Sequence, residues 1–349
     1  MMDVNKYITV ADLVKAIQIG QKQDFENIFT SLGATFTGKH VYGFSSGHGA
    51  LSVLIKARGW KKVGLPSFVC PRLYQAIKSA GAKPVVLDVE AKTFNLSSTS
   101  FKKQPDIQAI IVVHTFGVLA DIFKIRQVLP KGVEIIEDCA HAIGVGGIGL
   151  GDHLLFSLYK QTGNIGGAML ITKTKLEEYP RLSQFDQFFK IAPRLTIFSG
   201  LRNYWRSKSN LPVSSDVIEQ TFGLSSLVFN LFAVQIPEVL ADLPHRRKLI
   251  TFYRSCLDSR LFTFQEGQEN GSGMFFNVLI KSNIPGIRNK ILLKLRQNKI
   301  FCDRQWYDTM AFSQKTGRDL AEKIINIPLS DRLEKVEFIN KVVRENIDG

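Results

Sequence analysis

Residues 107–114 read IQAIIVVH, and this stretch decides the fold. Its apolar residues continue without the in–out alternation of a half-exposed strand. KPVVLDV at residues 83–89 and VEIIEDC at residues 133–139 have the same character. Unbroken valine and isoleucine runs are typical of strands buried on both faces, as in a parallel sheet that helices cover. The three stretches therefore predict an α/β architecture.

Helix-like stretches alternate with these strands. Residues 50–60 (ALSVLIKARGW), 72–81 (RLYQAIKSAG) and 123–131 (FKIRQVLPK) have helical spacing, and Gly81 is a natural helix stop. The alternation extends over about residues 30–180. We therefore expect a mostly parallel sheet flanked by helices in this part of the chain.

The pattern changes after Lys175. Residues 188–212 carry five basic side chains and no acidic one, and a long helical stretch is expected from about Ser214 to Ser255. Strand-like MFFNVLIK and IINIPL then alternate with helical stretches to the end of the chain. This predicts a second, smaller α+β domain, with the large domain at residues 1–244 and the small one at residues 245–349.

The composition points to an anionic partner. A chain of 349 residues is too long for one ordinary core, and 45 Lys and Arg against 31 Asp and Glu give it a net charge of +14. So basic a protein is expected to meet nucleic acid, a phosphorylated metabolite or a membrane surface. The sequence has no helix-turn-helix, zinc-finger or aromatic-basic strand pattern, so nucleic acid is not predicted as a partner.

The cysteines and the apolar stretches predict a cytoplasmic protein. Cys70, Cys139, Cys256 and Cys302 lie far apart and form no CxxC pair, which indicates buried thiols rather than a disulfide framework or a metal site. The N-terminus has no apolar stretch of the signal-peptide kind. The most apolar stretch, residues 223–243, is interrupted by polar residues and fails as a membrane span.

Two features suit the binding of a phosphorylated ring. SSGHGAL at residues 45–51 is a small-residue turn that enters a helix, where backbone N–H groups suit a phosphate, although an ordinary capped loop has the same pattern. Asp138 ends a buried strand, at the edge where open α/β sheets bind ligands, and could hold a protonated ring nitrogen. His141 could lie against the face of that ring. The alternative for this pair is a helix-capping aspartate and a surface histidine.

A lysine completes the set. Lys160 lies three residues after Ser157, between a strand-like stretch and a glycine turn, and could project into a cleft, although most lysines are simply solvated. Desolvation or a neighbouring cation would lower its pKa and allow attack on a carbonyl carbon. Residues 144–149 match GxGxxG formally, but they run into a strand-like stretch instead of a helix, so they predict no dinucleotide site.

Together these parts are recognisable. A phosphate cradle, a carboxylate for a ring nitrogen and a Schiff-base lysine are what a pyridoxal 5'-phosphate (PLP) enzyme needs. The chain resembles the DegT/DnrJ/EryC1/StrS family of PLP-dependent sugar aminotransferases, closely over about residues 28–180 and more loosely to the end. The resemblance rests on the stretches SSGHGAL, LPSFVCPRLYQAIKSAGAKPVVLDV, IIVVHTFGVLADI, EIIEDCAHAIG and FSLYK…GGAML. It implies the fold-type I architecture, in which a mostly parallel, seven-stranded type of sheet forms the large domain of a homodimer.

The resemblance also implies a role for each candidate residue. Lys160 would bond to the cofactor and move a proton during the reaction, Asp138 would keep the pyridine nitrogen protonated, and His141 would stack on the ring. The cofactor phosphate would contact three further positions, the backbone amides of Gly47 and His48 and the hydroxyl of Ser157. The family's reaction moves an amino group from glutamate or glutamine to a keto-sugar on a nucleoside diphosphate. The implied purpose is synthesis of surface polysaccharide, lipopolysaccharide or a related glycan.

Departures from the family pattern keep other functions open. His48 replaces a usual threonine. Lys160 follows Ser157 by three residues where most members have five, a spacing that resembles a Ser-Leu-x-Lys sub-branch of the family and does not by itself suggest loss of function. TFGLSS at residues 221–226 lacks the asparagine and arginine of a stretch that usually reaches into the neighbouring subunit. One alternative is a sugar dehydratase with the same cofactor, although such relatives typically replace the lysine by histidine. Another is a binding or regulatory member that has lost catalysis.

Residues 188–212 support a separate hypothesis. Their aromatic and aliphatic side chains lie among unopposed cations, so the segment could rest on an anionic membrane surface. The alternative is an insertion that packs against the large domain or the dimer partner.

Overall fold

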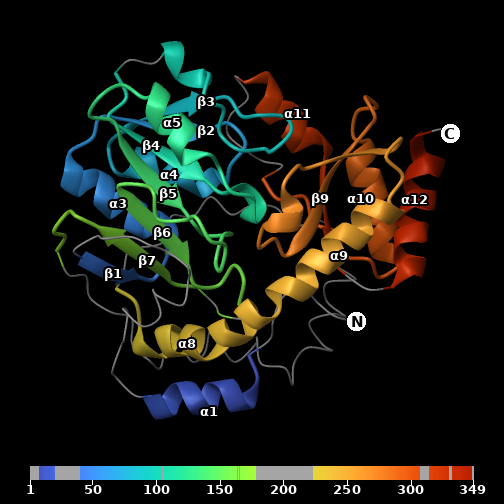
Figure 1. Cartoon of the computed structure of the whole chain (residues 1–349), viewed down its shortest axis with the longest axis horizontal. Coiled ribbons are helices and arrows are strands. Elements are labelled where there is room, and N and C mark those ends of the chain that lie inside the picture. The colour runs from blue at the N-terminus through green and yellow to red at the C-terminus, as the bar shows by residue number, and fades with distance from the viewer. Residues whose placement is uncertain are drawn as a thin grey trace.

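The computed structural model describes residues 8–19, 40–103, 106–162, 164, 166–177, 223–306, 314–329 and 332–347. The segment 188–212, for which membrane contact was considered, lies outside these residues. Two sheets lie side by side in Figure 1, a larger one built from the first half of the chain and a smaller one from the second half.

The larger sheet is mostly parallel, as predicted. Among the described residues it has seven strands in the order β1-β7-β6-β5-β4-β2-β3. Their bounds are His40–Phe44 (β1), Lys62–Pro66 (β2), Lys83–Leu87 (β3), Ala109–Val113 (β4), Glu134–Asp138 (β5), His153–Ser157 (β6) and Ala168–Thr172 (β7). β7 runs antiparallel to both its neighbours, and the pairs from β6 to β3 are parallel.

Both faces of this sheet are buried, which explains the unbroken apolar runs in the sequence. On β4, Ile111 and Val113 pack in one core with helices α3 (Gly47–Arg58) and α4 (Pro71–Ser79), and Ile110 and Val112 pack on the other face with α5 (Ile122–Val128). Farther along that second face, β6 and β7 pack against α8 (Ser226–Ala241), and α1 (Val10–Ile19) covers α8 from outside (Figure 1).

The smaller sheet is antiparallel, in the order β10-β9-β8, with strands at Phe262–Phe264 (β8), Phe275–Ile280 (β9) and Ile324–Pro328 (β10). It packs with the helices α9 (Leu243–Cys256), α10 (Ile287–Gln297) and α12 (Leu333–Ile347). Helix α11 (Lys315–Lys323) places Leu320 and Ala321 in the core of the larger sheet. Short 3-10 helices occupy Ser100–Lys103, Thr115–Gly117 and Gln268–Asn270.

The helical stretch expected up to Ser255 is confirmed over most of its described part, but it is divided into two helices. Within its described part, α8 and α9 are two helices that meet at 51°. Pro244 in the first turn of α9 has no N–H to donate back into α8, so the helical hydrogen bonds cannot continue across the junction. The expected domain boundary at residue 244/245 falls in this first turn, and it stays a prediction. No single described helix is long and apolar enough to cross a membrane, and only the bent pair α8–α9 meets that test when counted together.

Candidate active site

A cavity of about 290 Å³ at the carboxyl ends of the parallel strands brings the predicted residues together. Chain segments that follow β1, β2, β5 and β6 meet there, which is where open α/β sheets bind ligands. The cavity is lined by all six candidate residues, Gly47, His48, Asp138, His141, Ser157 and Lys160.

One end of the cavity suits an anion. Helix α3 begins there, and its N-cap, Ser46, accepts a hydrogen bond from the Gly49 N–H at 3.3 Å. Gly47 and His48 form the first turn, whose N–H groups have no acceptor inside a helix. The Ser157 hydroxyl is buried at the end of β6 and has no hydrogen-bond partner among the described residues. A buried, unpaired hydroxyl is costly, so a ligand oxygen that hydrogen-bonded to it would be stabilised.

The Asp138 carboxylate forms no ion pair within the part of the chain that the structure describes. Burial raises its pKa, although the Ala140 N–H, which donates to Oδ1 at 2.9 Å, and the charges of His114 and Lys160 work in the opposite direction. A buried carboxylate in this state favours a partner that carries a positive charge or donates a proton. A protonated ring nitrogen would meet that need.

His141 forms part of an aromatic wall. Its half-buried ring lies 5.9 Å from the Phe116 ring and 5.7 Å from the Trp306 ring, measured between centroids. Burial, and then the charge of Lys160, lower the pKa of His141 to about 3. The ring is therefore neutral at physiological pH and can lie against a flat ligand without adding a charge.

The expected direction of the Lys160 shift is wrong. The pKa of Lys160 is raised, chiefly by Tyr159 and further by Cys70 and Asp138, although burial opposes the rise. The Lys160 ammonium lies 5.3 Å from the centre of the Tyr159 ring, so the ring face also favours the charged amine. Sequence reasoning considered the effects of burial and of neighbouring cations on this pKa. It missed the effect of Tyr159, the residue just before Lys160.

Sequence reasoning also missed Trp306. This residue lines the same cavity but belongs to the loop between α10 and α11, 146 positions after Lys160. Nothing in its local sequence marks it, because its place depends on how the second sheet packs against the first. Arg72, in the first turn of α4, lines the cavity as well and was not singled out.

A buried group of hydrogen bonds supports the strand behind Asp138. The Glu137 carboxylate accepts hydrogen bonds from His114 Nε2 at 2.9 Å, Gly149 N at 2.8 Å and Gly151 N at 2.6 Å. The Ala120 N–H donates to His114 Nδ1, so the His114 proton sits on Nε2 and points to Glu137. The thiol of Cys139 lies close to His114 and Glu137, and the ligand atoms of the three residues are within 4.8 Å of one another, as in a metal site. The ligand atoms of His114 and Glu137 are already engaged in hydrogen bonds, so the cluster is a hydrogen-bonded group and not a set of open metal ligands.

The glycine run of residues 144–149 thus has an internal partner. It leads into β6, as the sequence indicated. The N–H of Gly149, the last residue of the run, and that of Gly151 just after it donate hydrogen bonds to the Glu137 carboxylate. A side chain at Gly151 would lie 2.8 Å from Glu137 Cβ, so only glycine fits this approach.

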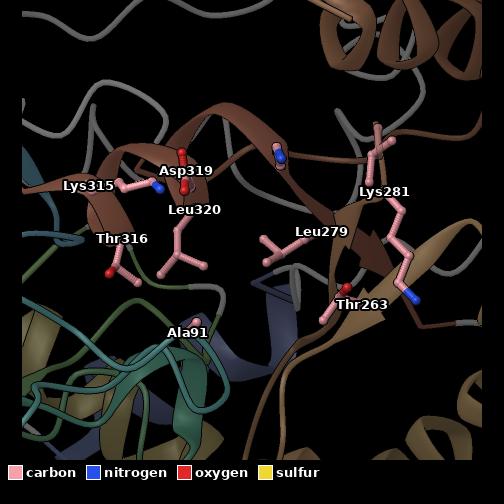
Figure 2. Close-up of a pocket in the computed structure, with 10 residues that line it drawn as sticks. Ala91, Thr263, Leu279, Lys281, Lys315, Thr316, Asp319 and Leu320 are labelled. Carbon is pink, nitrogen blue, oxygen red and sulfur yellow. The ribbon is translucent and has the colours of Figure 1, made fainter. Parts of the chain in front are cut away.

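A second cavity, of about 370 Å³, lies between α11 and the edge of the smaller sheet (Figure 2). It is larger than the first, but none of the candidate residues line it. In Figure 2, Lys315 and Asp319 lie on α11, opposite Leu279 and Lys281 on the sheet. Lys281 Nζ donates to the Ser259 carbonyl, so this amine is engaged outside the cavity. The candidate catalytic and cofactor-binding residues therefore all line the cavity of about 290 Å³.

Comparisons with known proteins identify the family. Residues 4–184 match the model of the DegT/DnrJ/EryC1/StrS aminotransferase family. The chain is 26% identical over 340 residues to a UDP-N-acetyl-3-dehydro-alpha-D-glucosamine 3-aminotransferase of Acidithiobacillus ferrooxidans, covering 89% of this chain and 85% of that protein. It is 25% identical over 333 residues to a dTDP-4-amino-4,6-dideoxy-D-glucose transaminase of Shigella dysenteriae, covering 86% and 84%.

Among solved structures, the chain is similar to the PLP form of a Streptococcus pneumoniae protein described as a sugar aminotransferase. The TM-score is 0.72 at 17% identity, over 99% of this chain and 98% of the other. At this identity the likeness shows the fold, a mostly parallel sheet with a smaller second sheet beside it.

Proposed function

The chain belongs to the DegT/DnrJ/EryC1/StrS aminotransferase family, whose cofactor is PLP, and from this premise we propose that its amino acceptor is a keto-sugar linked to a nucleoside diphosphate. The names of the two relatives that span most of the chain support the acceptor class, because both act on nucleotide-linked sugars. The basic charge of +14 suits a substrate with two phosphates.

The observation that carries the proposal is the makeup of the cavity. The first turn of α3 and the unpaired Ser157 hydroxyl suit a phosphate, and the buried Asp138 carboxylate suits a protonated ring nitrogen. Lys160 lines the same cavity and supplies the amine. The residues present therefore fit PLP in kind.

Each residue then has a defined task. When bound, PLP supplies a carbonyl carbon that exchanges amino groups and a protonated ring that withdraws electrons from the bond being broken. Lys160 would hold that carbon through its amine, and its Nζ would accept and donate a proton. Asp138 keeps the ring nitrogen protonated, and the neutral His141 ring flanks the cofactor. Gly47, His48 and Ser157 anchor the phosphate.

Further features of the proposal follow the family pattern. We propose glutamate or glutamine as amino donor, a role in polysaccharide, lipopolysaccharide or related glycan synthesis, a homodimer, a cytoplasmic location, and a division into domains at residues 1–244 and 245–349. For residues 188–212 we propose packing against the large domain or the dimer partner, with contact to an anionic membrane surface as the alternative.

The test is the visible absorbance of the purified protein with PLP, beside Lys160→Ala. We expect the wild type to show a band that Lys160→Ala lacks, and glutamate to convert that band to the absorbance of the amine form of the cofactor. Lys173→Ala, which removes an exposed lysine just after β7, is the matched control and should behave as wild type.

The outcomes separate the alternatives. A band that neither glutamate nor glutamine changes would favour the dehydratase. No band in the wild type would refute the enzyme and leave the binding or regulatory protein. If the donor reacts, turnover with UDP-linked and dTDP-linked keto-sugars tests the acceptor, and failure with nucleotide-linked keto-sugars of every kind tried would reject that class.

A further inference from the structure

Three aromatic residues beside the cavity have left-handed backbones. Phe94, Phe116 and Trp306 have φ values of 63°, 55° and 64°, and apart from Lys299 no other non-glycine residue in the described ranges has a positive φ. Bulky residues avoid this region and persist there only where their surroundings hold them. All three pack on the Phe68 ring, at centroid distances of 6.1, 5.9 and 5.4 Å. Three positive φ values around one ring indicate that a shared structure holds these residues.

A chain of buried side-chain amides extends from the second sheet to the residues that precede these aromatic residues. Gln265 Nε2 donates to the carbonyls of Thr93 and Thr115, the residues that precede Phe94 and Phe116, at 2.8 and 3.0 Å. Asn277 Nδ2 donates to Gln265 Oε1 at 3.1 Å. The chain then continues from Asn277 to Asn326.

Its far end holds the third aromatic residue. Asn326 Nδ2 donates to Asn277 Oδ1 at 2.8 Å, and Asn326 Oδ1 accepts from the Gln305 N–H, just before Trp306, at 2.6 Å. The three amide side chains, Gln265, Asn277 and Asn326, are at most 1% exposed. We call these three residues the amide chain. Each left-handed aromatic residue therefore follows a residue whose backbone the amide chain holds.

The direction of this chain is fixed at both ends. The Thr93 and Thr115 carbonyls can only accept, so Gln265 must present its NH₂ group to them and its oxygen to Asn277. The Gln305 N–H can only donate, so Asn326 must present its oxygen there and its NH₂ group to Asn277. No amide can flip without leaving buried groups unpaired, which makes the arrangement unique.

We propose that the amide chain is a positioning device, through which the second sheet sets the Phe116–Trp306 pair and thereby the His141 ring at the cavity. The Phe116 and Trp306 rings stack at 4.6 Å and 26°, and both lie within 6 Å of His141. The carbonyl of His141 is fixed separately, by Gln161 and Ser272, so its backbone is held while the aromatic pair limits its ring. The role in catalysis rests on the proposed function, in which His141 flanks the cofactor.

The chain offers a matched pair of variants to test this. Gln265→Met keeps the length and removes the donor to Thr93 and Thr115. Gln268→Met removes an equally buried amide that bonds Asn277 and the Gln265 backbone but contacts none of the residues preceding the aromatics. Both should lower the melting temperature, and only Gln265→Met should disturb the wall.

The first readout needs no cofactor. Near-ultraviolet circular dichroism of each protein, minus that of its Trp306→Phe derivative, isolates the Trp306 signal. We expect Gln265→Met to lose most of that signal and Gln268→Met to keep it. With PLP, we expect Gln265→Met to shift the visible band and lower kcat/KM about tenfold, mainly through kcat, while Gln268→Met stays within about twofold of wild type. Equal Trp306 signals in the two variants would overturn the proposal.

Two further results keep the test decisive. If Gln265→Met does not fold, Asn326→Asp breaks the link to Asn277 while it keeps an acceptor for the Gln305 N–H, and the same loss of signal is expected from it. If the wild type shows no PLP band, the proposed function fails, but the Trp306 signal still decides whether the amide chain positions the wall.

Discussion

Replacement of Glu137 by glutamine is the sharpest test of the energetics behind Asp138. Glu137 is fully buried, and its carboxylate accepts from three N–H groups, those of His114, Gly149 and Gly151. A glutamine in the same place must turn its NH₂ group toward one of these donors. The least costly choice faces Gly151, since only one hydrogen bond is then lost.

The magnitude follows from these contacts. A hydrogen bond to a charged group contributes about 1.5–3 kcal/mol, and the lost bond to Gly151 is of this kind. The other two bonds become neutral and weaker, which costs about 1 kcal/mol more in total. We therefore expect Glu137→Gln to lower the free energy of unfolding by about 3 kcal/mol at pH 7. For a chain of 349 residues, whose unfolding entropy is about 0.7 kcal/mol per degree, that is a fall in Tm of about 4 °C.

The pH dependence has a definite sign. Burial works to raise the pKa of Glu137, but the hydrogen bond and charge of His114 and the two glycine N–H groups hold it below the ordinary value of 4.5. The stabilisation is therefore complete above pH 4.5 and is lost as the pH falls through the lower folded-state pKa. Urea unfolding followed by circular dichroism should show the gap between wild type and Glu137→Gln shrinking in acid.

A control lies on the same strand. Glu134 is partly exposed, and it pairs with His153 and Arg58. Because exposed pairs contribute less, Glu134→Gln should cost about 1 kcal/mol or less. A Glu137→Gln protein as stable as wild type at pH 7, or a gap that persists unchanged at pH 3, would refute the reasoning.

Three further predictions concern the cavity. Because Tyr159 raises the pKa of Lys160, Tyr159→Phe should lower that pKa and speed the attachment of PLP near pH 7.5. Stopped-flow absorbance measures this rate, and the control Tyr74→Phe on α4 should leave it unchanged. Ser157→Ala should weaken PLP binding about tenfold in equilibrium titration while the Tm of the cofactor-free protein does not fall, because the hydroxyl has no partner to lose among the described residues. With a pKa of about 3, the His141 ring should show no titration between pH 5 and 8 in nitrogen-15 NMR, and a protonation step in that range would contradict its assigned environment.

The parallel sheet was predictable because burial on both faces leaves a direct trace in the sequence. A residue on β4 has no solvent side, so every position is apolar, and the run itself indicates the environment. The break between α8 and α9 was not predicted, because the buried positions of the more polar α9, Leu243, Ile250 and Tyr253, keep a helical spacing after the apolar α8. Pro244 was the available signal, and it was outweighed by the periodicity around it.

The cavity was predictable where its residues follow strands and not where they come from the second sheet. The ends of parallel strands meet at one edge, so Asp138 and Ser157 could be placed together from order alone. Trp306 reaches the cavity through packing between the two sheets. Its position depends on an amide chain whose successive members lie 12 and 49 residues apart, the last of them 21 residues after Gln305. Pairings at that range have no local period. The raised pKa of Lys160 was missed for a related reason, since its direction depends on where the fold places the Tyr159 hydroxyl, Cys70 and Asp138 around the amine.

The glycine-rich turn before β6 has a consequence for how such motifs are interpreted. Backbone N–H groups that a run of glycines exposes do not distinguish a phosphate that a ligand brings from a carboxylate that the protein carries itself. Here the anion is Glu137, so the turn is complete without any guest molecule. Its amides should exchange with solvent equally slowly with and without cofactor. A glycine-rich motif of this kind thus predicts an anion-binding site, and only the fold shows whether the anion is a ligand or a side chain of the protein.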